Sequence, residues 1–316
     1  MPVVAEIVRN GVVEGKHHGS VVALRDDGSV DWAVGEVEEP ILPRSCNKPL
    51  QALAMVRAGL DLPPDLLALA CASHSGEPFH VEGVRRILAS AGLDESALQC
   101  PADFPLDEQA RHDVIRSGGD KAPILMNCSG KHAAMLATCV TTGWDPATYL
   151  APMHPLQRFT VQVFTEMTGE PVAHHAVDGC GAPLLSTSMV GLARAFRRLA
   201  RATAGPAHRI AEAIRTHPAY VSGTRRDERA LLEAIPGAIA KFGAEACHVV
   251  ALADGRAFAL KIEDGGDRAR PVVMAAALRR SGVDTEAGVD TAAVRRTGEH
   301  VLLGGGVPVG EIRATL

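Results

Sequence analysis

The stretch Arg44-Ser45-Cys46-Asn47-Lys48-Pro49-Leu50-Gln51 separates a β-like N-terminus from a helical middle. It opens an apolar run over 50–56 that predicts a buried helix. If the helix starts here, Ser45 and Lys48 share one face of its first turn. A neutral lysine amine can accept the proton of a serine hydroxyl, and a helix N-terminus favours a developing oxyanion. The stretch therefore predicts a Ser–Lys nucleophile; a helix cap beside a solvated lysine is the simpler alternative.

Composition restricts the class of protein. The chain has 316 residues, of which 47% are hydrophobic and 22% charged, an ordinary balance for a globular protein. Its net charge of −5 gives no electrostatic footprint for nucleic acid. We find neither a signal-peptide pattern nor an apolar run of about eighteen residues, the length that spans a bilayer. The seven cysteines are scattered, which favours reduced thiols. We therefore expect a cytoplasmic protein without nucleic-acid or membrane partners.

Strand-like segments occur at both ends of the chain. Val, Ile and Ala dominate the early ones, and apolar or alternating patterns mark the late ones: 3–9, 19–25, 30–34, 247–253, 256–263 and 299–312. Between them, helical patterns follow one another: 64–72, 78–91, 107–117, 129–142, 155–168, 186–203, 206–216 and 226–234. We expect a single α+β domain over 1–316. Its antiparallel sheet comes from about 1–40 and 240–316, with a helical region of about 45–235 inserted.

Two further features point to a site near Ser45. The cluster Ser73-His74-Ser75-Gly76-Glu77 follows a buried apolar segment, where it lines a site or forms a simple turn. Lys261 lies on the small-residue face of its strand, where it is either exposed or directed into a site. A second ammonium near Lys48 would help to keep the Lys48 amine neutral.

Two cysteine-containing clusters indicate a metal site. Cys128 and Lys131, in Asn127-Cys128-Ser129-Gly130-Lys131-His132, share a face at a helix start. In Asp178-Gly179-Cys180-Gly181, the flanking glycines expose the thiol of Cys180. Two cysteines near an Asp and a His fit a thiolate site, and zinc with one open position is the metal we expect there. Buried thiols beside a solvated lysine are the alternative.

Taken together and in this order, the clusters resemble the class 3 asparaginases of the rhizobial inducible type. Nearly the whole chain carries the resemblance. The stretches are Ser45-Cys46-Asn47-Lys48-Pro49-Leu50-Gln51, Ser73-His74-Ser75-Gly76-Glu77, Asn127-Cys128-Ser129-Gly130-Lys131-His132, Asp178-Gly179-Cys180-Gly181, Tyr220-Val221-Ser222-Gly223-Thr224-Arg225, Gly243-Ala244-Glu245 and Ala259-Leu260-Lys261-Ile262-Glu263-Asp264-Gly265. The sequence departs from the family at Ala246, where we expect glycine, and at Gly304-Gly305-Gly306.

The resemblance implies a fold like that of serine β-lactamases and bacterial glutaminases, and a homodimer. It implies two Ser–Lys pairs, Ser45 with Lys48 and Ser73 with Lys261. It also implies one Zn²⁺ per chain, which positions the substrate. Its ligands would be Cys128, Lys131 and Cys180, and the substrate-binding residues Arg44, His132, Asp178 and Cys247.

The function expected on these grounds is that of an L-asparaginase. Ser45 would attack the side-chain amide of L-asparagine with Lys48 as base, and water would hydrolyse the β-aspartyl ester. One alternative is a penicillin-recognising or glutaminase-like serine hydrolase on the same fold. The penicillin-recognising version normally needs Ser-Asp-Asn and Lys-Thr-Gly, and this sequence has neither. The other alternative is a non-catalytic protein that holds zinc.

Overall fold

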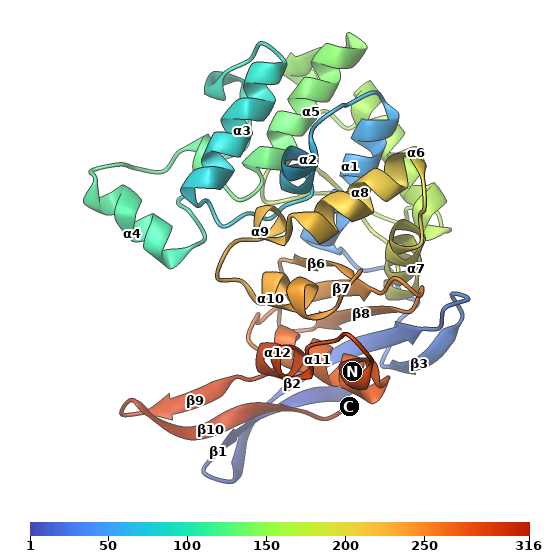
Figure 1. The fold of residues 1–316 in the computed structure, drawn as a ribbon, viewed down its shortest axis with the longest axis vertical. Helices are drawn as coiled ribbons and strands as arrows, with labels where there is room; N and C mark the ends of the chain where they lie inside the picture. The colour runs from blue at the N-terminus through green and yellow to red at the C-terminus, as the bar shows by residue number, and fades with distance from the viewer. The chain divides into compact units, whose positions relative to one another are not determined.

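All 316 residues are described by a computed structural model, and the chain forms two units (Figure 1). Unit 1 consists of Met1–Cys46, Thr187–Arg201 and Ala230–Leu316. Unit 2 consists of Asn47–Ser186 and Ala202–Arg229. Unit 1 therefore combines both chain ends, and unit 2 is made mostly from the middle of the chain.

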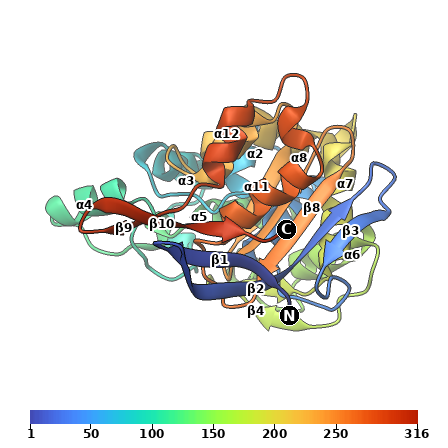
Figure 2. The same cartoon turned by 90° about the horizontal axis from the view of Figure 1, so that it is seen from below.

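An antiparallel sheet of eight strands is the centre of unit 1. Its order is β6-β7-β8-β2-β1-β10-β9, and β3 pairs with β2. The strands are β1 (Val3–Arg9), β2 (Val12–Leu24), β3 (Val30–Val34), β6 (Ile239–Gly243), β7 (Cys247–Ala251), β8 (Ala257–Ile262), β9 (Val301–Gly304) and β10 (Val307–Ala314). Because β1 pairs with β10 and β2 with β8, the two chain ends interleave (Figure 2). This confirms the predicted α+β class and the sheet built from both ends.

Helices α7 (Met189–Ala200) and α11 (Arg270–Arg280) pack on the strands of unit 1. α7 contacts β2, β7 and β8, and α11 contacts β1, β8 and β10. Every residue of β7 is buried, which explains why that strand is apolar on both faces. Helix α12 (Thr291–Thr297) packs against α11. Helix α10 (Asp227–Ala234) begins in unit 2 and ends in unit 1.

Unit 2 is helical, with three apolar helices at its core. α1 (Lys48–Arg57) contacts α5 (Ser129–Thr142), and both contact α2 (Pro64–Ala70). All of α1 from Lys48 to Val56 is buried, so its charged first residue is buried too. Around the core lie α3 (Pro78–Ser90), α4 (Glu108–Arg116), α6 (Pro155–Thr168), α8 (Gly205–Thr216), α9 (Pro218–Val221) and the two-stranded β4–β5 sheet (His175–Val177, Pro183–Leu185). None of the helices is both long and apolar enough to cross a membrane.

Local differences from the predicted elements have simple causes. Ser45 lies in a short 3₁₀ helix, η1 (Arg44–Asn47), and not in the first turn of α1 as expected. Helix α1 starts at Lys48, because Pro49 has no N–H to donate and is pre-organised for a first turn. Strand β2 begins at Val12, well before the expected 19, because Asn10 and Gly11 adopt positive φ and close a β1–β2 hairpin.

Candidate active site

Lys48 is buried where α1 begins. Its side chain is 1% exposed, and its Nζ donates hydrogen bonds to the Ala72 carbonyl at 2.5 Å and to Ser73 Oγ at 3.0 Å. Both acceptors belong to the segment that follows α2. The structure thus brings two of the predicted catalytic residues, Lys48 and Ser73, into direct contact within unit 2. The pairing of Lys48 with Ser45 stays a prediction.

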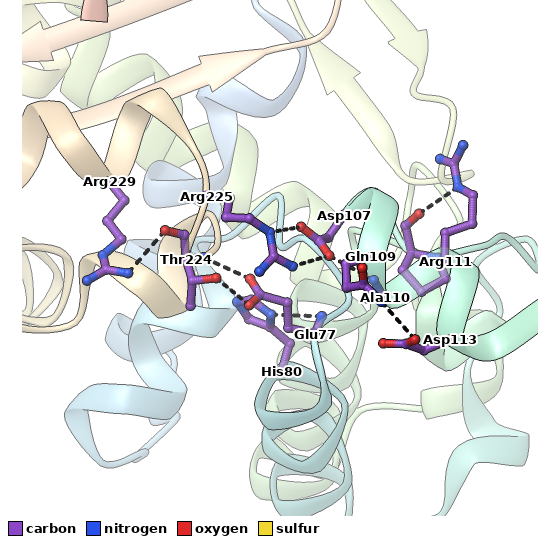
Figure 3. Close-up of polar contacts among 11 residues, drawn as sticks. Glu77, His80, Asp107, Gln109, Ala110, Arg111, Asp113, Thr224, Arg225 and Arg229 are labelled. Atoms are coloured by element: carbon purple, nitrogen blue, oxygen red, sulfur yellow. Dashed lines mark hydrogen bonds and ion pairs between the residues drawn. The ribbon is translucent and has the colours of Figure 1, made fainter. Parts of the chain in front are cut away.

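Two acidic side chains connect the segment that follows Ser73 to Thr224 and Arg225 (Figure 3). The Glu77 carboxylate accepts hydrogen bonds from Thr224 N at 2.8 Å and from Thr224 Oγ1 at 2.6 Å. The Asp107 carboxylate accepts two from the Arg225 guanidinium, while Asp107 N donates to the Ser75 carbonyl. Thr224 binds the segment that follows Ser73 directly through Glu77, and Arg225 binds it indirectly through Asp107.

Ser45 belongs to unit 1, where the turn that carries it packs against strand β6. Cys46 Sγ donates to the Lys241 carbonyl at 3.1 Å. A Cβ atom on Gly243 would lie 2.5 Å from the Pro43 carbonyl oxygen and 3.2 Å from Ser45 N. Only glycine therefore allows this approach. Ser45 is 8% exposed, and Arg44 lies 3.5 Å from the Glu245 carboxylate.

The other unit 1 residues of the predicted site meet at the β6–β7 turn. Lys261 on β8 lies opposite Cys247 on β7, and its Nζ donates to the Glu245 carbonyl at 2.5 Å and to the Ile262 carbonyl at 2.8 Å. Glu245 and Ala246 both have positive φ, at 59° and 51°. Glycine adopts this conformation more readily than alanine, so the glycine that the family resemblance led us to expect at 246 would fit this backbone. The pairing of Lys261 with Ser73 stays a prediction.

The predicted metal ligands are brought together in unit 2. Lys131 Nζ donates to Cys180 Sγ at 3.0 Å, and the Cys128 thiol donates to the neighbouring Asn127 Oδ1 at 3.0 Å. Asp178 lies 3.9 Å from Cys180 Sγ. His132 also interacts with Cys180, and its Nδ1 lies 2.6 Å from the hydroxyl of the buried Tyr149.

The electrostatics of this cluster separate a thiolate from a thiol. The Cys128 side chain and the nearby Lys131 ammonium lower the pKa of Cys180 well below its usual value, although burial opposes this. The Cys180 side chain, together with burial, raises the pKa of Cys128. Burial disfavours the charge on Lys131, but the negative charges around it outweigh burial and raise its pKa. This arrangement favours a Cys180 thiolate beside a charged Lys131.

The donor set fits a zinc ion. Two cysteine side chains that influence each other's pKa, with an amine 3.0 Å from one of the sulfur atoms, match the preference of zinc for thiolate and nitrogen ligands. No group of three His, Cys, Asp or Glu side chains in the chain could hold a metal by itself, so the set depends on Lys131. A lysine binds a metal only as a neutral amine, so metal binding would displace its proton.

The family to which the chain belongs identifies the class of enzyme. The family model described as L-asparaginase II matches residues 5–314. The protein is therefore an amidohydrolase. The chain belongs to the L-asparaginase II family, as the resemblance of its motifs implied. L-asparagine is the substrate that fits this family. Among curated proteins, no sequence match is found.

Solved structures show only distant overall similarity. A β-lactamase from Mycobacterium bovis is 16% identical with a TM-score of 0.48; the match covers 83% of this chain and 94% of that one. A β-lactamase described as putative, from Bacteroides dorei, is 12% identical with a TM-score of 0.41, covering 83% and 93%. A hydrolase with promiscuous acyltransferase activity, EstCE1, is 14% identical with a TM-score of 0.41, covering 84% and 93%.

Three features of the site could not be found in the sequence by our reasoning. The Lys48–Ser73 contact joins residues 25 positions apart. Tyr149 reaches His132 from a loop that contains no recognisable motif. The Glu245 carbonyl accepts from Lys261, but a main-chain oxygen leaves no residue-type signal. Only the positive-φ pair at 245–246 had a sequence trace, in the expectation of glycine at 246.

Proposed function

We propose that the protein acts as an L-asparaginase through Ser45 and Lys48. The observation that carries this proposal is the buried amine of Lys48, whose two hydrogen bonds go to neutral oxygen atoms. Such an amine can exchange a proton without breaking an ion pair. The L-asparaginase II match over residues 5–314 supplies the substrate class.

The proposed reaction has two halves. Ser45 Oγ attacks the side-chain amide carbon of L-asparagine while its proton passes to Lys48, and the C–N bond breaks to release ammonia, which takes up that proton. A water molecule then attacks the β-aspartyl ester, and L-aspartate leaves as the proton returns to Ser45. The contact between Lys48 and Ser73 supports Ser73 as a proton relay to the base. Lys261 would tune the same pair as a second ammonium.

The remaining predicted residues would bind the substrate or a metal. Zinc on Cys128, Lys131 and Cys180 would supply positive charge that orients the substrate. This proposal is supported by the contact of the Lys131 amine with the Cys180 sulfur and by the effect of Cys128 on the pKa of Cys180. Substrate contacts are assigned to Arg44, His132, Asp178 and Cys247. We further propose a cytoplasmic homodimer, as the resemblance and the scattered positions of the cysteines indicate, that binds neither nucleic acid nor membranes.

Ammonia release by the purified protein tests the proposal. With L-asparagine, L-glutamine and buffer alone, release should be fastest with L-asparagine. Ser45→Ala should retain less than roughly a hundredth of the wild-type rate, since loss of a covalent nucleophile normally costs more than that. Ser73→Ala is the matched variant and should lose less.

Two results would redirect the assignment. If the Ser73→Ala variant were inactive and the Ser45→Ala variant active, Ser73 would be the nucleophile, in keeping with its contact to Lys48. Turnover of a chromogenic cephalosporin without ammonia release would favour the penicillin-recognising alternative.

A further inference from the structure

His74 links two parts of unit 2 that carry proposed functional residues. We propose that His74 is a positioning residue that holds Ser73 against Lys48 by tying the segment after α2 to the first turn of α5. The inference rests on the proposed function, because it concerns the geometry of the proposed Ser–Lys chemistry. It concerns a residue that touches neither the substrate nor the reacting atoms in that proposal.

The imidazole of His74 is completely buried and its tautomer is set by its partners. The Gly76 N–H donates to Nδ1 at 3.1 Å, so Nδ1 carries a lone pair. Nε2 therefore carries the proton and donates to Ser129 Oγ at 2.9 Å. Ser129 Oγ donates in turn to the Ile124 carbonyl at 2.8 Å. Both ring nitrogens of His74 are hydrogen-bonded, and Ser129 Oγ both accepts and donates a hydrogen bond. The ring therefore has a single orientation.

The two ends of this chain lie next to the proposed machinery. On one side, His74 directly follows Ser73, whose Oγ accepts from Lys48 at 3.0 Å. On the other side, Ser129 is the first residue of α5, between Cys128 and Lys131 in sequence. The main chain adds a parallel contact, since His74 N donates to the Asn127 carbonyl at 3.0 Å. A shift at the start of α5 would therefore be passed to Ser73 through His74.

His80 offers a matched comparison within the same unit. Its Nδ1 accepts from Glu77 N at 3.2 Å, and its Nε2 donates to the Ala219 carbonyl at 2.9 Å. The two rings stack with their centroids 5.1 Å apart, and both are buried. The hydrogen bonds of His80 lead to α9 and to the start of α3, and not to Ser73 or α5. Replacing His80 thus tests for general damage from losing a buried histidine.

The experiment measures kcat and KM for L-asparagine in four variants of the full chain. His74→Asn keeps an acceptor near Nδ1 and loses the donor to Ser129; His74→Gln keeps a donor near Nε2. Ser129→Ala removes the acceptor, and His80→Gln is the control. We expect His74→Asn and Ser129→Ala to lower kcat by about tenfold to a hundredfold, with KM within about threefold, because displacement of a catalytic group by about 1 Å has such effects. His74→Gln should recover most of kcat.

A double variant completes the test. The double variant, His74→Asn with Ser129→Ala, should be no slower than the slower of the two single variants, because both substitutions break the same hydrogen bond between His74 and Ser129. The inference is overturned if Ser129→Ala keeps kcat within about threefold of wild type, if the two effects multiply, or if His80→Gln is equally slow. Ser129→Ala decides alone if His74→Asn does not fold. Absence of ammonia release by the wild type would instead overturn the proposed function, and the inference with it.

Discussion

Lys48 and Lys131 have almost the same local setting but different partners. Each lies at or near the start of an apolar helix of unit 2, and each is 1% exposed. Lys48 donates to a carbonyl and a hydroxyl, whereas Lys131 donates to the sulfur of Cys180. Neutral oxygens leave an amine free to exchange its proton, while a neighbouring thiolate favours the charged form. The comparison teaches that the partners, and not the lysine or its helix position, assign the chemistry.

The largest expected effect separates the two lysines. Lys48→Met should lower kcat by about 10³-fold, because a general base contributes roughly 10² to 10⁴. Lys131→Met should mainly raise KM and leave kcat within about tenfold, because it removes positive charge at the proposed substrate-orienting cluster. Steady-state kinetics on both variants, with circular dichroism to confirm folding, measures this. An equal collapse of kcat in both variants would show that the two lysines act in one step.

A smaller effect concerns His80, a buried histidine in helix α3. Burial lowers the pKa of His80 from its usual 6.5 to about 4. The folded state therefore disfavours protonation, so this contribution to stability is complete above about pH 6.5 and is lost as pH falls towards 4. The loss should be about 3 kcal/mol at pH 4, since one pKa unit is worth about 1.4 kcal/mol.

Urea unfolding at pH 7 and pH 4 measures this loss. In His80→Gln, the fall in the free energy of unfolding between the two pH values should be about 3 kcal/mol smaller than in the wild type. An identical fall in both proteins would mean that His80 titrates normally in the fold.

The smallest expected effect tests the Lys131 cluster through its thiolate. Cys180→Ala should raise KM for L-asparagine about tenfold and lower kcat by less than about fivefold, as expected when uniform binding is lost. Elemental analysis should show the zinc content falling from about one per chain to a small fraction.

Cys139 provides the control for this substitution. It is a buried thiol on α5, and burial raises its pKa to about 11. Cys139→Ala should leave both the zinc content and KM unchanged. If Cys180→Ala abolished kcat at constant KM, zinc would have a role in generating the nucleophile. If the wild-type protein were fully active without zinc, Cys180 would be an ordinary buried thiol.

Much of the architecture could be predicted because it depends on local patterns. The helix over 155–168 and the one over 129–142 were predicted with their observed bounds, since a glycine in the left-handed conformation ends each of them. The antiparallel sheet from both chain ends followed from strand-like segments at those ends. Strand β6 was missed, because it is short and Lys241 interrupts its apolar pattern, although that lysine is buried in the fold.

The sequence by itself determined which residues are candidates for chemistry, because serine, lysine and cysteine recur in short motifs beside apolar helical segments. It also determined the family, through motifs in a fixed order. Only the tertiary structure decided that Lys48 meets Ser73, that Lys131 meets Cys180, and that His74 reaches Ser129. These contacts join residues between 25 and 55 positions apart. Their distances depend on how α1, α2 and α5 pack, which no local pattern specifies.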